Sequence, residues 1–159
     1  YIHEDFSVYE GEWHNDEKWG RGTEWWADGS CFRGEFELGC KHGTGKFLNK
    51  NGDVIFEGTF VNDLMDGHGV YRFNDGRIYD GQWRRGHMDG EGRMRWPDGR
   101  SYVGCYSEDL MHGEGVFMWA DKRQYRGQWS RGKQDGQSVL VDAAGNTTSG
   151  TWIGGRRLR

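Results

Sequence analysis

The sequence predicts an all-β protein, an elongated solenoid of tandem β-hairpins that form a single twisted antiparallel meander. Three observations predict this fold. Aromatic residues recur at a near-constant spacing, glycines stand at fixed places after them, and no useful length of the chain has helical periodicity. In repeat proteins each unit packs only on its neighbours. With strands about 4.8 Å apart, about thirteen strands would extend over roughly 60 Å.

The repeat is clearest in Tyr79–Ser101, which reads YDGQWRRGHMDGEGRMRWPDGRS. Two aromatic residues flank a glycine, and strand alternation places Tyr79 and Trp83 on one face. A polar turn follows, and then Gly90 and Gly92 open a second strand. The acidic-glycine pair after that strand is typical of a tight turn. Each repeat therefore predicts one hairpin and the link to the next.

The same pattern runs along the chain with a step of 23 residues, and once of 24. The extra residue lies within Asp53–Ile55 and predicts a β-bulge, which adds local twist. Repeats begin near positions 9, 32, 56, 79, 102 and 125, with a partial repeat near 148, so the predicted array covers 9–155. Residues 1–8 are expected to be the remnant of a preceding repeat or an N-terminal cap, and 156–159 a basic C-terminal tail.

Two aromatic columns arise from this period and are the candidate partner-binding face. Glycines between them lack a Cβ and let rings lie over the backbone. The rings can pack on one another as a thin core, or leave an open groove for a peptide or helix, and different rings are expected to do each. The columns are Tyr9, Phe32, Phe56, Tyr79, Tyr102 and Tyr125, and Trp13, Phe36, Phe60, Trp83, Tyr106 and Trp129.

The segments YEGEW, FRGEF, FEGTF, YDGQW, YVGCY and YRGQW, each followed by a Gly-x-Gly pair that weakens in the last copy, resemble MORN repeats. The resemblance covers essentially all of Tyr9–Gly155. It implies the roles known for such repeats: cytoskeletal scaffolds that dimerise, myosin adaptors, junction proteins between membranes, and accessory regions of lipid kinases and methyltransferases. It also implies a capacity to bind phosphoinositides.

Composition restricts the class of protein. The 28 glycines would favour disorder, but they stand in register and 15% of the residues are aromatic. No apolar run approaches the roughly 20 residues that span a bilayer, and no signal peptide opens the chain. Because the first residue is Tyr1, the chain is expected to be a segment of a longer protein. The odd number of cysteines, Cys31, Cys40 and Cys105, favours free thiols in a reducing, cytoplasmic setting.

No catalytic residue or cofactor is predicted. The Gly-x-Gly pairs precede strands, whereas a dinucleotide fingerprint needs a following helix. Every serine, cysteine and histidine occupies a repeat position that unrelated residues fill in other copies, as in a scaffold. Cys40 and His42 are weak candidates for structural zinc, which needs about four converging ligands. His42 shares its position with His112 and several aspartates, which favours a residue that stabilises the turn into the Gly-x-Gly pair.

Charge is distributed unevenly along the chain. Residues 1–29 contain eight acidic and two basic side chains, whereas 121–159 contain three acidic and eight basic ones. Opposite ends would therefore attract, which predicts an antiparallel homodimer. The residues predicted for self-association or for contact with anionic phospholipid are Glu10, Glu12, Arg156, Arg157 and Arg159. Nucleic acid is not expected, because the arginines of the fourth repeat alternate with acids.

The sequence as a whole predicts a non-catalytic scaffold for protein–protein interaction, in a cytoskeletal or membrane-associated assembly. Its expected partner is a helix or peptide, in addition to a second copy of the chain. Two alternatives remain from the residues alone: a peripheral module that binds phosphoinositides or anionic membranes, and the regulatory repeat region of a larger enzyme such as a lipid kinase.

Overall fold

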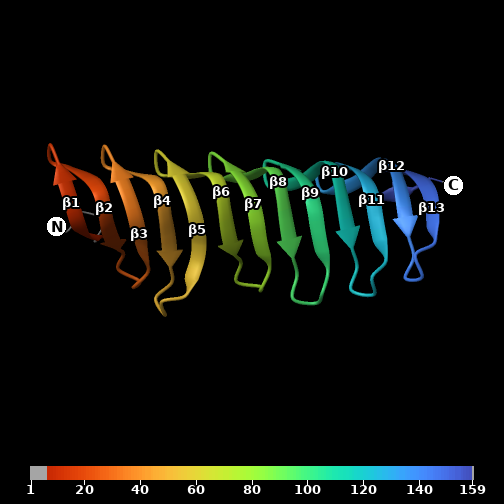
Figure 1. Cartoon of the computed structure of the whole chain (residues 1–159), viewed down its shortest axis with the longest axis horizontal. Coiled ribbons are helices and arrows are strands. Elements are labelled where there is room, and N and C mark those ends of the chain that lie inside the picture. The colour runs from red at the N-terminus through yellow and green to blue at the C-terminus, as the bar shows by residue number, and fades with distance from the viewer. Residues whose placement is uncertain (1–6, 159) are drawn as a thin grey trace. The chain divides into compact units, whose positions relative to one another are not determined.

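The computed structural model describes residues 7–158, and it has no helix in that range (Figure 1). Accordingly, no helix long and apolar enough to cross a membrane occurs among these residues. The predicted all-β meander of tandem hairpins is confirmed. The strands are β1 (Val8–His14), β2 (Glu17–Trp25), β3 (Cys31–Glu37), β4 (Cys40–Leu48), β5 (Val54–Val61), β6 (Leu64–Arg72), β7 (Ile78–Arg84), β8 (His87–Arg95), β9 (Ser101–Ser107), β10 (Leu110–Met118), β11 (Gln124–Ser130), β12 (Lys133–Val141), β13 (Thr147–Ile153) and β14 (Arg156–Arg157).

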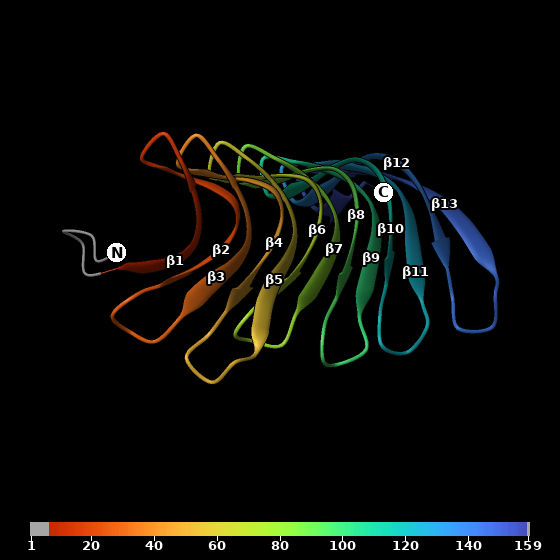
Figure 2. The same ribbon diagram turned by 60° about the vertical axis from the view of Figure 1, so that its left-hand side comes forward.

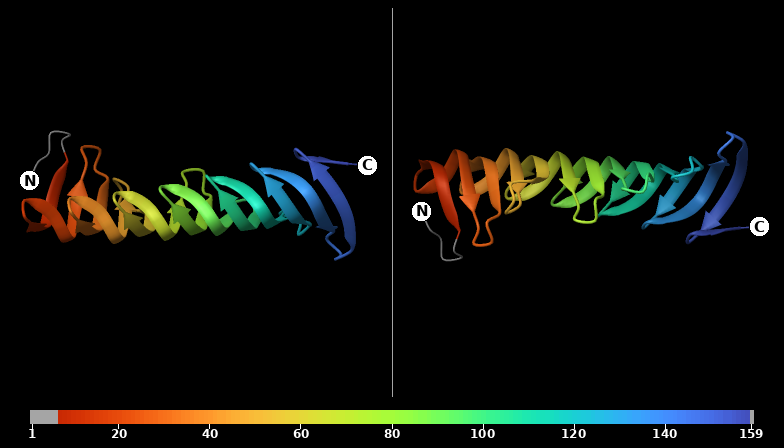
Figure 3. Two further views of the ribbon diagram at one scale, coloured as in Figure 1. Left: turned by 90° about the horizontal axis from the view of Figure 1, so that it is seen from above. Right: turned by 90° about the horizontal axis from the view of Figure 1, so that it is seen from below.

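The chain divides into two compact units. The first unit comprises the described residues up to Phe73 together with Trp83–Gly86, and the second comprises Asn74–Gln82 and the residues from His87 onward. Strands β1 to β6 of the first unit pair antiparallel in chain order. Strands β8 to β14 of the second unit do the same. Figures 2 and 3 show that the strands within each unit are curved rather than flat.

Two kinds of turn connect the strands. Tight hairpin turns place both central residues at positive φ, as at Asn15 (50°) and Asp16 (63°), which matches the twist of the flanking strands. The longer turns between repeats carry a glycine at positive φ, such as Gly99 at 96°. Lys122 occupies that turn position in the fifth repeat with φ 77°. A side chain there is strained, because the left-handed region favours glycine.

β-Bulges occur at two kinds of place. Within the hairpins, the register shifts just after the glycine of the aromatic-glycine-aromatic segment, as between Gly11 and Trp13. A second kind occurs between β4 and β5, where Phe47 pairs with Phe56 but Leu48 pairs with Val54, which leaves one residue of β5 without a counterpart. The bulge predicted from the 24-residue step is confirmed.

The core consists of aromatic rings lying over glycine backbone. Tyr9 and Tyr79 are almost fully buried, and a Cβ added at Gly22 or Gly92 would overlap their rings. Each tyrosine hydroxyl donates a 2.8 Å hydrogen bond to a carbonyl three residues further along, that of Gln82 in the case of Tyr79. Burial raises the pKa of the Tyr79 phenol well above its ordinary value. The tyrosines therefore function as neutral, packed side chains.

Consecutive repeats are joined by edge-to-face ring pairs. In the first unit the Phe32 and Phe60 centroids are 5.1 Å apart at an interplanar angle of 83°. In the second, Tyr102 and Trp129 are 5.5 Å apart at 88°. Edge-to-face pairs are a favoured aromatic geometry. The two aromatic columns thus form a continuous core within each unit.

From the second hairpin onward, the tight turns also bond to the hairpin before them. The Asp63 backbone N–H donates to the Lys41 carbonyl at 2.9 Å in the first unit, and the Asp109 N–H donates to the Met88 carbonyl at 2.9 Å in the second. These bonds join residues 21 or 22 positions apart, close to one repeat length. A turn is therefore stabilised by the repeat that precedes it.

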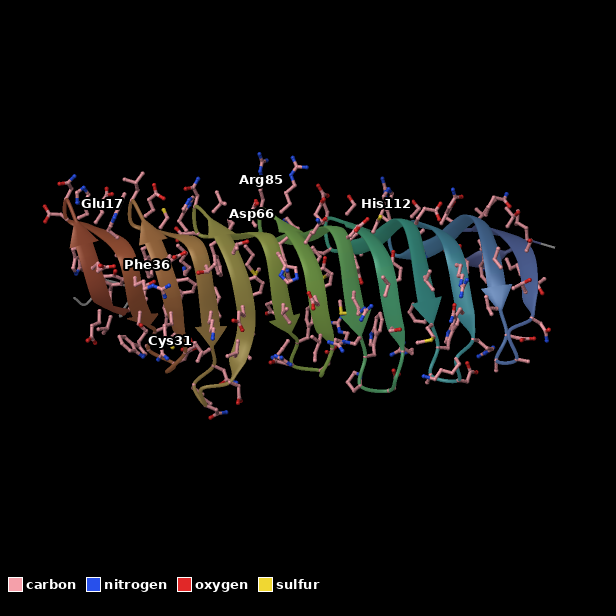
Figure 4. All side chains as sticks on the ribbon, in the orientation of Figure 1. Glu17, Cys31, Phe36, Asp66, Arg85 and His112 are labelled. Carbon is pink, nitrogen blue, oxygen red and sulfur yellow. The ribbon has the colours of Figure 1, made fainter. Side chains whose placement is uncertain are left out.

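The repeat position shared by His42 and His112 contributes to the same support. The Asp66 carboxylate accepts the Arg85 backbone N–H at 3.2 Å, and Figure 4 shows the two residues together at the edge that carries the tight turns. At the equivalent position the His112 ring Nδ1 faces the Arg131 N–H at 3.4 Å. The position stabilises a turn, as expected, but the turn belongs to the following repeat.

Candidate functional site

Most of the aromatic residues predicted to bind a partner lie in the core. Eleven of the twelve are buried, and only Trp13 is exposed, at 45% of its surface. Because these rings cover one another, they present little surface to a partner in this structure. Their use in partner binding stays a prediction.

An open groove lies instead in the first unit, with a volume of about 910 Å³. Its floor is the backbone of Gly22, Gly34, Gly45 and Gly58. Its walls are side chains that alternate with the core residues along β2 to β6, and these therefore belong to the opposite face of the sheet. The wall residues are Arg21, Thr23, Arg33, Thr44, Lys46, Leu48, Val54, Glu57, Thr59, His68 and Val70.

The groove is lined by more cations than anions. Arg21, Arg33 and Lys46 are exposed, and Glu57 is the one carboxylate in the wall. Lys46 lies 3.6 Å from Glu57. Arg33 stands directly opposite Lys46 across β3 and β4 and opposite Thr23 across β2 and β3. Like charges in directly opposite positions destabilise a sheet pair.

Two carboxylates beside the groove are engaged by the backbone. Glu12 accepts the Arg21 backbone N–H at 2.5 Å, and Glu35 accepts the Thr44 N–H at 2.7 Å. The Thr44 backbone N–H is also the main reason that the pKa of the Glu35 carboxyl is below its ordinary value. At the glycine bulge of these two hairpins, the strand pairing leaves backbone N–H groups without a carbonyl partner, and the two carboxylates accept their hydrogen bonds instead.

The residues predicted for self-association lie in different surroundings. Glu10 is exposed on β1, whereas Glu12 has the bond to Arg21 just described. Arg156 and Arg157 are exposed on β14, and Arg157 donates to the Ser149 carbonyl at 3.3 Å. Arg159 lies outside the described residues. Whether these groups contact a second chain or lipid stays a prediction.

The weak zinc candidates have other neighbours. The His42 ring lies 3.4 Å from the Glu37 carboxylate. Burial, and then the nearby Asp63 carboxylate, raises the pKa of the Cys40 thiol, which disfavours the thiolate that binds zinc. Within residues 7–158, no three histidine, cysteine or acidic side chains gather as metal ligands would.

Sequence reasoning missed two lysines in the core. Lys18 and Lys41 occupy the repeat position where Met65, Met88 and Met111 stand in later copies. Their side chains are only 14% exposed. The alternation of β2 and β4 was a signal for this placement, but lysine is rarely buried without a partner.

Each of these lysines has both an acid and aromatic rings beside it. The Lys41 ammonium lies 5.5 Å from the ring centroids of Trp26, Phe32 and Phe47, and 3.9 Å from the Asp63 carboxylate. Lys18 forms an ion pair with Glu24, which itself fills a core position. Cation–π contact and ion pairing together compensate for the burial of the charge.

The second unit has a smaller cavity of about 210 Å³. Methionines dominate its wall, with Met88 and Met94 buried and Met111 partly buried. Arg77 and Asp109 are the charged residues that line it. On the outer face of the second unit, Glu91 and Glu114 stand where the first unit has Arg21, Thr44 and His68. Arg93 and Arg126 take the repeat positions of Lys46 and Arg33 there.

Tandem hairpins with a repeated ring-over-glycine core, and side chains free to vary on the outer face, define a β-repeat protein. The MORN repeat model matches residues 9–31, 32–54, 56–76, 79–99, 102–122 and 125–147. The chain therefore belongs to the MORN-repeat family, as its sequence predicted. Repeats of this family generally act as non-catalytic modules for interaction with proteins or membranes.

Among solved structures, one similar chain is the TCP domain of SAS-4 (dCPAP) from Drosophila melanogaster, in complex with a proline-rich motif of Ana2 (dSTIL). It is 12% identical, the match covers 84% of this chain and 72% of that one, and the TM-score is 0.52. The likeness concerns the fold. No curated protein matches the sequence significantly.

Proposed function

We propose that the chain is a non-catalytic scaffold module that binds an extended segment of a partner protein in the groove of the first unit. The observation that carries this proposal is the open groove of about 910 Å³ with a floor of glycine backbone. The wall side chains stand on either side of this floor, so a peptide can lie over the backbone between them. The peptide bound to the structurally similar TCP domain is consistent with this use.

A scaffold role agrees with how polar side chains vary among the repeats. Cys105 occupies a position that glutamate, threonine or glutamine fills in other copies. A residue that could serve as a nucleophile or base is thus replaced by unrelated residues at the same position of other repeats. We place no chemistry of its own in this chain.

The proposed role of the groove is tested by placing a bulky side chain in it. Thr44→Trp introduces a large ring into the wall and keeps the backbone N–H that bonds to Glu35. Gln137→Trp is the matched control, because Gln137 is exposed at the same repeat position in the second unit. Peptides selected from a random display library on the parent chain should lose binding to the first variant and keep binding to the second. Loss of binding in neither variant, or no selected peptide at all, would contradict the proposed function.

Self-association is a further part of the proposed scaffold role. Exposed apolar residues occur on the first strand, at Val8 and Trp13, and near the last, at Ile153 and Leu158. Together with the acidic start and basic end of the sequence, they favour an antiparallel homodimer. Sedimentation equilibrium at low and high salt tests this, and a monomer at high protein concentration in both would exclude it.

The alternative is a peripheral module for anionic membranes, which the exposed Arg156 and Arg157 favour. Co-sedimentation with phosphatidylserine vesicles, with and without Arg156→Gln/Arg157→Gln, distinguishes it from the scaffold. We place the scaffold in the cytoplasm, in a cytoskeletal or membrane-associated assembly. The regulatory repeat region of a larger enzyme such as a lipid kinase is the remaining alternative.

A further inference from the structure

We propose that the groove of the first unit is selective for acidic peptides, bound extended across β2 to β6. This inference rests on the proposed function and specifies the chemistry of its partner. It follows from three properties of the groove: exposed cations, a like-charge pair, and a floor without side chains.

Arg21 and Arg33 are the cations available to a ligand. Both are exposed, and neither forms an ion pair with any residue in 7–158. Arg21 lies opposite Glu35, but that carboxylate already accepts two hydrogen bonds from Thr44. The Arg33 guanidinium, able to bind a carboxylate through paired N–H donors, is therefore free in the groove wall. The Arg21 guanidinium is also exposed, and the carboxylate beside it is that of Glu35, whose pKa it helps to lower.

The pair formed by Arg33 and Lys46 opposes folding and favours an anion. The two stand directly opposite on neighbouring strands, and only Lys46 has a carboxylate close by, at 3.6 Å on Glu57. A like-charge pair destabilises the sheet. A carboxylate bound between them would neutralise that repulsion. Binding therefore recovers the stability that the like-charge pair takes from the sheet when the groove is empty.

The floor determines the shape of the occupant. A Cβ at Gly34 or Gly45 would point to the core side, towards Phe32, so the groove side shows bare backbone. Five strands spaced about 4.8 Å apart make a path of about 19 Å, the length of about six extended residues. A path of this length, with side chains on both sides, fits a single extended chain. A membrane or a nucleic acid would need a broad basic face.

The experiment uses a fluorescein-labelled octapeptide of alternating glutamate and serine, with alternating lysine and serine as the opposite-charge probe. Fluorescence anisotropy should show binding of the glutamate peptide only, and binding should weaken as salt rises from about 50 to about 300 mM, because exposed charges are screened. Arg21→Gln/Arg33→Gln should weaken it about tenfold, because the exposed ion pairs that the two arginines form with the peptide are lost.

The matched control is Arg93→Gln/Arg126→Gln in the second unit, where these residues occupy the repeat positions of Lys46 and Arg33 and are likewise exposed. This variant should bind the glutamate peptide as the parent does. Thermal melting checks the fold, and Arg33→Gln should melt no lower than the parent because it removes the like-charge pair.

Three outcomes would overturn the inference: equal binding of both peptides, an unchanged affinity in Arg21→Gln/Arg33→Gln, or an equal loss in the second-unit control. Loss of binding to phosphatidylserine vesicles, but not to the peptide, in that first double variant would assign the arginines to lipid instead. If library peptides still bind through Thr44 while the acidic probe does not, the proposed function stands and the acidic selectivity fails.

Discussion

In the first unit, Lys18 and Lys41 stand at a core position that Met65 fills in the next repeat, and that Met88 and Met111 fill in the second unit. Lys41 lies among Trp26, Phe32 and Phe47, whereas Met88 lines a cavity of about 210 Å³. The outer faces differ as well, because Glu91 and Glu114 in the second unit take the repeat position of Arg21, Thr44 and His68 in the first. The aromatic and glycine columns are shared by both units. The comparison teaches that the repeat conserves a frame, which consists of the aromatic rings and the glycines under them. The residues at the other repeat positions can vary, and they make the two units different.

The largest expected effect comes from removing a ring from this shared frame. Trp83→Ala in the first unit and Trp129→Ala in the second each delete a buried indole. Each should lower the free energy of unfolding by about 3–5 kcal/mol. Hydrogen exchange should show the loss of protection concentrated in the unit that carries the substitution.

Trp13→Ala is the control, because this exposed ring belongs to the same column. It should cost less than about 1 kcal/mol. Uniform loss of protection over all strands in both core variants would contradict the division into two units.

The next effect tests the lysine–methionine difference. Lys41→Met should leave stability unchanged or raise it by about 1 kcal/mol, because well-packed apolar groups often replace partly buried ion pairs without loss. Met88→Lys should lower it by about 2 kcal/mol, since a buried cation needs compensation. Urea denaturation gives both values. Equal effects of the two exchanges would show that the surroundings of the position do not differ.

A smaller effect is expected at the turns between repeats. Lys122→Gly should raise stability by about 1 kcal/mol, because Lys122 holds φ 77° where other repeats have glycine. The reverse exchange, Gly99→Lys, should lower stability by a similar amount. Thermal melting of the two variants is the measurement, and the same sign in both would contradict the strain assigned to this position.

The smallest effect is a pH dependence in the second unit. The hydrogen bond between the His87 ring and the Asp109 carboxylate, 2.7 Å long, raises the pKa of His87. Its stabilisation should therefore be complete below the unfolded pKa of about 6.5 and be lost as pH rises through the higher folded pKa. His87→Gln should remove this part of the pH profile of melting, which lies above about pH 6.5. A parent and variant with parallel profiles would contradict it.

The frame could be predicted from the sequence because it repeats. Six copies can be compared with one another, so the aromatic columns were evident despite local exceptions. The one step of 24 residues likewise indicated the bulge near Ile55. The groove could not be predicted, because Arg33 and Lys46 are 13 positions apart and only strand register makes them neighbours. Lys18 and Lys41 were missed for another reason: a long side chain can bury its stem and still place its charge against an acid. The pattern of polar and apolar residues along the sequence does not show which acid will pair with a buried lysine.

The bonds that join each turn to the preceding hairpin give the chain a direction. The turn residues Asp63 and Asp109 donate their backbone N–H groups backwards along the chain, to carbonyls of an earlier strand. During synthesis from the N-terminus, each new hairpin would meet an acceptor that already exists. A shortened chain should likewise tolerate loss of its last repeat better than loss of its first. Loss of the first leaves the next turn without its acceptor, whereas loss of the last removes no acceptor from the remaining turns.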